Sequence, residues 1–75
     1  MVYSIMSEIQ AVLFNQHKFT TAEARDWLRK HILHPCKRVH ETHTYYRYRI
    51  QDPARYRRFV TKRFGPGIKF IIGIL

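Results

Sequence analysis

The stretch that decides the fold is HTYYRYRI, residues 43–50. Its side chains alternate in character: one set holds Tyr46, Tyr48 and Ile50, and the other holds Tyr45, Arg47 and Arg49. Successive side chains of a β-strand lie on opposite faces of the sheet, so this period of two predicts a half-buried strand. The first set must then pack against another layer of the protein, while the arginine set faces solvent.

A helix in FTTAEARDWLRKHIL, residues 19–33, can supply that layer. Thr20 and Glu23 have the spacing of a capping box, and Phe19 is placed to act as the outer half of a hydrophobic staple. The helix face expected to meet the sheet holds residues at helical spacing, which are Ala24, Trp27, Leu28, His31 and Ile32. Because Pro35 disfavours helical geometry at His34, the helix should end near Ile32 or Leu33.

Further elements flank these two. EIQAVLFNQ, residues 8–16, fits a helix through Ile5, Ile9, Val12 and Leu13 or a strand through Ile9, Ala11 and Leu13, and we favour the strand. In DPARYRRF, residues 52–59, Asp52 can cap a short 3₁₀ turn that starts at Pro53. RFVTKRFGPGIKFIIGIL, residues 58–75, fits two strands joined through Gly65-Pro66-Gly67. The last strand, residues 68–75, is expected to be central under the helix, the alternative being an edge that pairs with a second copy or with another protein.

This order predicts an α+β fold, β-α-β-short turn-β-β, in which one main helix packs on a small, mostly antiparallel sheet. The 75 residues leave room for one core, so residues 1–75 are expected to form a single compact basic domain. The expected core residues are Trp27, Leu28, Tyr46, Tyr48, Phe70 and Ile72. A core this small is marginal by itself, which favours association of some kind.

The charge is strongly unbalanced. Fourteen Lys and Arg face five acids, giving a net charge of +9. Residues 25–69 hold thirteen of the basic residues and three acids, a net +10, whereas residues 1–24 have a net charge of −1. Such a field favours nucleic acid, an anionic membrane surface or an acidic protein as partner. The lone Cys36 excludes an intrachain disulfide, and the absence of a signal peptide or a long apolar run predicts a soluble intracellular protein without a membrane span.

Clustered arginines can hold phosphates with bidentate geometry and release counterions, which gives affinity without sequence readout. The residues predicted to contact phosphate are Arg47, Arg49, Arg55, Arg57, Arg58, Lys62 and Arg63. Tyr45 is predicted to stack on a base or lie against a sugar. A secondary basic face on the helix holds Arg25, Arg29 and Lys30. The alternative is that the rings are core and the arginines only keep the sheet soluble, but +10 exceeds the net charge of about 2–8 that solubility requires.

The sequence gives little support for metal binding or catalysis. His31, His34, Cys36, His40 and His43 form the pattern H-x2-H-x-C-x3-H-x2-H, which offers zinc-ligand types at a spacing that matches no established finger. We therefore expect no metal and no cofactor. His31 is instead expected to face the core. The chain has no Walker-type phosphate loop and no Ser-His-Asp order, and its five acids are scattered, so we predict that it is not an enzyme.

The ordered combination of A..WL..H in residues 24–31, ET..YYR.R in residues 41–49 and T...G.GIK...G in residues 61–73 resembles a short module of large DNA viruses and some tailed-phage proteins. The resemblance covers residues 9–75, with Ile32-Leu33 in place of the glycine that usually follows the helix. It implies a viral origin and a compact module within or beside virion proteins, and it carries over no biochemical role.

Together these patterns predict a small virion-associated protein that binds viral DNA phosphates through an Arg/Tyr-rich face, with little sequence preference. Genome compaction is the role that such binding would serve, and DNA is favoured over RNA. Self-association or contact with a virion protein is also expected, in the virion and in the host-cell nucleus or cytoplasm during infection. The alternative function is that of a structural interaction protein, a minor capsid or cement component, without nucleic-acid binding.

Overall fold

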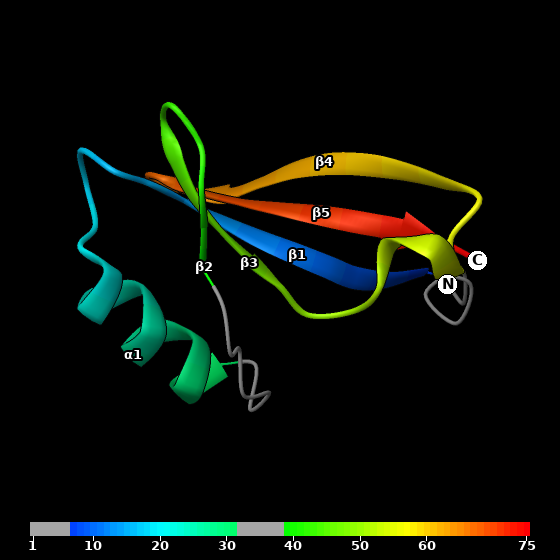
Figure 1. Ribbon diagram of the computed structural model, residues 1–75, viewed down its shortest axis with the longest axis horizontal. Helices are drawn as coiled ribbons and strands as arrows, with labels where there is room; N and C mark the ends of the chain where they lie inside the picture. The colour runs from blue at the N-terminus through cyan, green and yellow to red at the C-terminus, as the bar shows by residue number, and fades with distance from the viewer. Residues whose placement is uncertain (1–6, 32–38) are drawn as a thin grey trace.

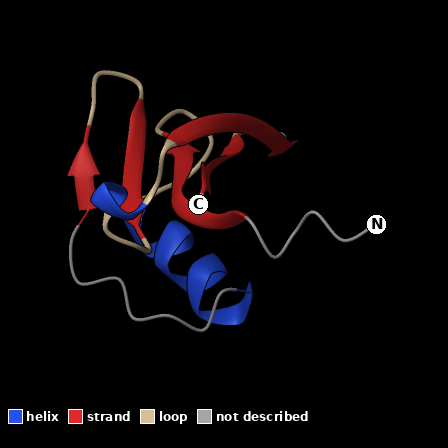
Figure 2. Ribbon diagram, turned by 90° about the vertical axis from the view of Figure 1, so that its right-hand side faces the viewer, coloured by secondary structure: helices blue, strands red, loops and turns tan. Residues whose placement is uncertain are grey.

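The computed structural model describes residues 7–31 and 39–75 (Figure 1). In chain order the elements are β1 (Ser7–Asn15), α1 (Thr21–His31), β2 (Val39–Glu41), β3 (Tyr45–Arg49), the 3₁₀ helix η2 (Pro53–Arg55), β4 (Arg58–Gly65) and β5 (Ile68–Ile74). The five strands of the described residues form one sheet in the order β2-β3-β1-β5-β4, and each neighbouring pair is antiparallel. Figure 2 shows α1 below the strands, on one side of the sheet. The predicted α+β fold is confirmed.

The core lies between α1 and the middle of the sheet. Its buried side chains are Val12, Phe14, Ala24, Leu28, Tyr48 and Ile68. Phe14 on β1 stands at its centre, because its ring makes edge contacts with Phe19, Trp27 and Tyr48 at centroid distances of 5.2, 5.7 and 5.7 Å. Edge contacts of this kind stabilise beyond simple burial. One β1 ring thus joins the helix to β3.

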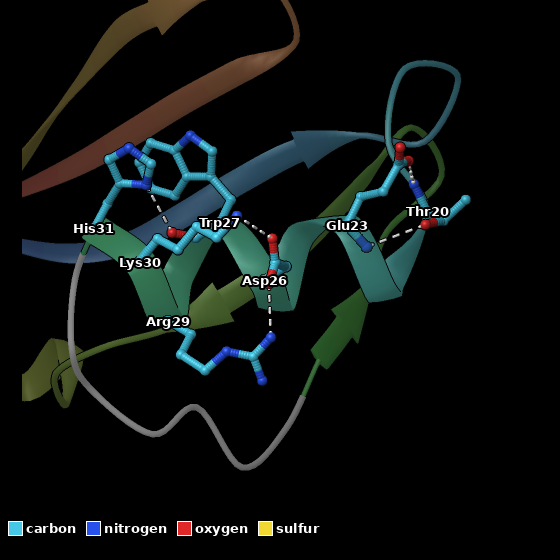
Figure 3. Close-up of polar contacts among 7 residues, drawn as sticks. All are labelled: Thr20, Glu23, Asp26, Trp27, Arg29, Lys30 and His31. Carbon is cyan, nitrogen blue, oxygen red and sulfur yellow. Dashed lines mark hydrogen bonds and ion pairs between the residues drawn. The ribbon is translucent and has the colours of Figure 1, made fainter.

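The start of α1 confirms the capping box (Figure 3). The Thr20 backbone N–H donates to Glu23 Oε1 at 2.8 Å, and the Glu23 N–H donates to Thr20 Oγ1 at 3.1 Å. Phe19, just before the cap, packs against the core. Two free N–H groups of the first turn are satisfied in this way, which fixes where the helix begins.

The predicted inner face of α1 is correct for its first two turns and wrong at its end. Ala24 and Leu28 are buried, and Trp27 is partly buried. His31, by contrast, is exposed. Its ring stacks on Trp27 at 4.2 Å, with Nδ1 2.9 Å from the Trp27 carbonyl oxygen. The Trp27 carbonyl lies one helical turn before His31, so the ring folds back along the helix rather than into the core. Ile32 and the predicted helix end near Ile32 or Leu33 lie outside the described residues.

The predicted strand 43–50 is shorter, and a further strand precedes it. Residues 43–44 form a bend between β2 and β3, whereas we predicted no strand between the helix and residue 43. Thr42 makes this hairpin: its N–H donates to the Tyr45 carbonyl at 2.8 Å, and its Oγ1 accepts from the Tyr45 N–H at 3.0 Å. A threonine side chain can thus close a tight turn that carries no glycine.

Residues 8–16 form a strand, as favoured, but their faces are not the expected ones. A bulge between Ile9 and Ala11 shifts the pairing with β5 by one residue. Val12 and Phe14 therefore face the helix, whereas Ala11 and Leu13 face the other side. Gln10 at the bulge is fully buried.

The remaining predicted elements are confirmed. The Asp52 carboxylate accepts from the Ala54 N–H at 2.9 Å, and Pro53 starts η2. The Gly65-Pro66-Gly67 segment joins β4 to β5, and Gly67 has φ 79°, which glycine adopts without strain. Because β5 lies between β1 and β4, the alternative that it is an edge is wrong.

Most of the expected core is confirmed. Leu28 and Tyr48 are buried, and Trp27, Tyr46 and Phe70 pack partly buried against the core cluster. Ile72 is half-buried and pairs with Val60 of the exposed edge strand β4. That position lies beyond the cluster, so Ile72 is not part of the core.

Candidate nucleic-acid interface

The face of the sheet opposite α1, here called the open face, carries a straight row of basic side chains. Residues paired directly across neighbouring strands point to the same side of a sheet. One line of paired residues crosses all five described strands, and in sheet order it runs His40, Arg47, Leu13, Lys69 and Arg63. We call these five residues the basic row. With strands about 4.8 Å apart, it spans roughly 19 Å.

Two more predicted contact residues lie on the open face beside this row. Arg49 and Tyr45 are two residues from Arg47 on β3, in either direction, so their side chains share its side of the sheet. Arg49 is exposed and Tyr45 is half-buried. Four of the predicted residues are therefore brought together on one face: Tyr45, Arg47, Arg49 and Arg63.

Arg47 is held in place by the β1 bulge. Its Nη2 donates to Gln10 Oε1 at 3.0 Å, while Gln10 Nε2 donates to the Gln51 carbonyl at 2.8 Å. The bulge thus places a buried amide whose oxygen fixes the guanidinium. Arginine has five N–H donors, so this single bond leaves most of them for a ligand. A positioned guanidinium loses less side-chain entropy when it binds phosphate.

Lys69 and Tyr45 interact across β1. The Lys69 Nζ lies 5.0 Å from the centre of the Tyr45 ring, a cation–π distance. We did not predict Lys69 as a contact residue, because the last strand is almost continuously apolar. The signal was present in the alternation itself, since Lys69 lies between Ile68 and Phe70 and must point away from the core that those two residues face.

The positive charge of the basic row is not offset by acids. Of the five acids, all within described segments, only Glu8 lies on the open face, paired with Gly73. Glu8 is engaged at the far end, where its carboxylate accepts from the Tyr56 hydroxyl at 2.8 Å and lies 3.4 Å from Arg55. Glu41 pairs with Tyr46 on the helix side. Within the described residues, Arg49 and Arg63 make no ion pair.

The other predicted contacts on β4 and before it do not join this face. Lys62 pairs with Phe70, and Arg58 occupies the same side of β4, so both point to the helix side. Arg55 is bound to Glu8, and Arg57 Nε donates to the Leu75 carbonyl at 3.0 Å. These last two lie at the end of the sheet next to η2 and the end of β5.

The single carboxylate of Asp26 partly offsets the charge of the secondary basic face on α1. Asp26 receives Arg29 Nη2 at 2.7 Å and lies 3.0 Å from Lys30 Nζ (Figure 3). The hydrogen bond from Arg29, followed by that from Lys30, lowers the pKa of the Asp26 carboxyl below its usual value. Of these three basic residues, Arg25 is the one that makes no ion pair within the described part of the chain. The helix is therefore a weaker candidate surface than the open face.

The histidine of the basic row is His40, which pairs with Arg47. In residues 7–31 and 39–75, no group of three or more His, Cys, Asp or Glu side chains is placed to hold a metal ion. His34 and Cys36 of the zinc-like pattern lie outside the described residues. No helix among the described elements is long and apolar enough to cross a membrane.

No protein-family model, curated protein or solved structure matches the chain. The case for the open face as an interface therefore rests on the geometry of this structure.

Proposed function

We propose that this protein binds nucleic acid through the open face, with phosphates held by the cations of the basic row and by Arg49. The observation that carries the proposal is the row itself: an arginine or lysine on three of five adjacent strands and a histidine on a fourth, with no acid among them. Solubility alone favours mixed charges, whereas phosphate binding favours one sign gathered on one surface.

The shape of the sheet supports binding to the backbone rather than to base edges. The major groove of B-DNA is about 12 Å wide and admits a helix or a two-stranded ribbon. A basic row of roughly 19 Å across five strands is too broad to enter it. Contacts to phosphate and sugar position a protein without reading sequence, so little sequence preference is expected. Tyr45 is placed to lie against a sugar or an unpaired base next to the row.

The resemblance to modules of large DNA viruses supports viral DNA as the ligand and the virion as the location. DNA is accordingly favoured over RNA, and compaction of a packaged genome is the role we propose. Neutralising phosphates is the step that such compaction requires. No residue set for catalysis enters this proposal, and none is needed for it.

A second candidate function is contact with another protein, as in a minor capsid or cement component. The exposed edge strand β4 favours it, since the exposed large hydrophobic residues of the described chain are Phe59, Val60 and Phe64, with 45%, 45% and 57% of their surfaces accessible. All three lie on β4. An edge strand with exposed apolar side chains is a common site of protein association. Val60 and Phe64 point to the helix side of β4, away from Arg63, so contact through these two residues can coexist with binding along the basic row.

The deciding experiment is a titration of labelled random-sequence duplex DNA, single-stranded DNA and RNA. Four arginines and lysines on the open face predict a slope of log K against log salt near −3.6 for duplex DNA, or a loss of roughly 150-fold between about 50 and 200 mM salt. Absent binding, or binding that salt does not weaken, would refute the proposal and leave the protein-contact function.

A further inference from the structure

A groove lies at one end of the basic row, beside the turn that joins β4 to β5. It has a volume of about 510 Å³, and its lining residues are Asn15, Lys18, Tyr45, Arg63, Gly65, Pro66, Gly67, Ile68 and Lys69. Three of these are cations from three separate segments, Lys18, Arg63 and Lys69, and none is an acid. The volume is within the range of small-ligand sites, which is about 300–1,000 Å³.

The backbone around the groove is tied together. The Asn15 N–H donates to the Gly67 carbonyl at 2.8 Å, and the Lys18 N–H donates to the Asn15 carbonyl at 3.0 Å. The Lys18 stem packs directly on Gly67, because a Cβ added to that glycine would lie 3.0 Å from Lys18 Cδ and 3.1 Å from Lys18 Cβ. Lys18 is thus positioned by the turn between β4 and β5, although it belongs to the segment between β1 and α1.

The other lining groups also favour an anionic ligand. Lys69 is held over the Tyr45 ring at 5.0 Å. The Asn15 side-chain oxygen accepts from the His17 N–H at 2.8 Å, so the group that Asn15 can offer a ligand is its amide N–H. Arg63 has no ion-pair partner among the described residues. Donors and cations therefore surround the groove, and no carboxylate offsets their mutual repulsion.

The charge of the ligand follows from this imbalance. An internal phosphodiester carries one negative charge, whereas a terminal phosphate monoester carries about −1.5 to −2 at neutral pH and three acceptor oxygens. Three cations that line one groove are better matched by the second. Because Arg63 and Lys69 belong to both the basic row and the groove, a strand bound along the row reaches the groove at one of its ends.

We propose that the groove binds the terminal phosphate of a nucleic-acid strand whose body lies on the open face. This inference rests on the proposed function and adds to it a preference for strand ends. Lys18, which lies outside the basic row, is the residue that distinguishes end binding from binding along the strand. The Tyr45 ring is placed to contact the terminal sugar or base.

The test compares one oligonucleotide sequence with a 5′-phosphate, with a 3′-phosphate and with hydroxyl ends, by fluorescence anisotropy at about 0.1 M salt. One additional charge held by the protein is expected to raise affinity roughly fivefold for a single strand and roughly eightfold for a duplex. The phosphorylated end that gives the gain identifies which terminus enters the groove. Lys18→Gln should abolish the gain and leave the affinity for the hydroxyl-ended strand unchanged, whereas Lys62→Gln, on the helix side of β4, should retain the gain.

The outcomes separate this inference from the proposed function. If all three oligonucleotides bind equally and with salt dependence, the end preference is wrong and the open face remains the binding surface. A gain that survives Lys18→Gln also overturns it. If no oligonucleotide binds, the proposed function fails, and the end preference fails with it. Circular dichroism spectra of the two variants check that their folds match, which is expected because both side chains are exposed.

Discussion

Replacing Arg49 and Arg63 with glutamine should weaken DNA binding sharply without disturbing the fold. Both side chains are exposed, and neither makes an ion pair within the described residues. They are two of the four arginines and lysines on the open face, so the slope of log K against log salt should fall from about −3.6 to about −1.8. At about 0.1 M salt the same loss of two phosphate contacts lowers affinity roughly 60-fold.

A matched control comes from β4, the strand that carries Arg63. Arg58→Gln with Lys62→Gln removes two charges as well, but these side chains point to the helix side of β4. All four residues lie on β3 or β4 and are exposed. If the open face binds DNA, this pair should change affinity by less than about threefold, which reflects only the weaker overall field.

The assay is fluorescence anisotropy of a labelled random-sequence duplex, repeated at several salt concentrations so that slopes and affinities are both obtained. Equal losses for the two pairs would refute the reasoning, because net charge rather than the open face would then govern binding. A larger loss for Arg58→Gln with Lys62→Gln would place the contact on the helix side of the sheet. Urea unfolding of each variant provides the check on stability.

Three further predictions concern the fold that supports this face, each measured as the free energy of unfolding in urea. Thr20→Ala removes one half of the capping box with Glu23 and should cost about 1 kcal/mol. Gly73→Ala should cost about 1–3 kcal/mol, because its Cβ would overlap the Tyr56 ring, while an alanine at the solvent-exposed Thr61 should cost less than 1 kcal/mol. Burial, followed by the hydrogen bond to Glu8, raises the pKa of Tyr56. The neutral form of Tyr56 therefore contributes to the free energy of unfolding. That contribution is fully present below about pH 10 and is lost as pH rises through the raised pKa. Tyr56→Phe should abolish this loss of stability at alkaline pH, and an unchanged loss in the variant would contradict the assignment.

The elements that could be predicted are those specified by neighbours in the chain. The Thr20 and Glu23 pair, the cap at Asp52 and the alternation of residues 45–49 are all local signals, and each appears in the structure as expected. β2 was missed because it has only three residues, and its pairing with β3 depends on a turn closed by the Thr42 hydroxyl. The β1 bulge was also missed, because it is stabilised by contacts with residues distant in the sequence. Gln10 at the bulge is buried and hydrogen-bonds to Arg47 on β3 and to Gln51 in the loop that follows.

The predicted site was divided because nearness in sequence was taken for nearness on a surface. Lys62 and Arg63 are adjacent, but successive residues of a strand point to opposite faces, so only Arg63 reaches the open face. The period of two that was used for residues 45–49 also holds for residues 58–64. It would have placed Lys62 and Arg63 on opposite faces of the sheet. Lys69 would have been found in the same way. Lys18 could not, because only the folded turn brings it against Gly67.

The open face is not covered by a helix, so cations on it can serve solubility as well as phosphate binding. Their presence alone therefore does not show which of the two they serve. Leu13 lies in the middle of the basic row, half-buried between Arg47 and Lys69, and the long stems of such residues cover apolar surface while their charged ends stay in water. Lysine next to glutamate would cover the apolar surface and keep the protein soluble equally well. Alternating charges would also lower the repulsion between neighbouring strands. What neither requirement explains is a row without acids. Arg63→Glu therefore separates the two explanations. If the row serves solubility only, the change should leave stability and solubility intact and alter nothing else. Phosphate binding instead predicts a loss of DNA affinity greater than that of Arg63→Gln.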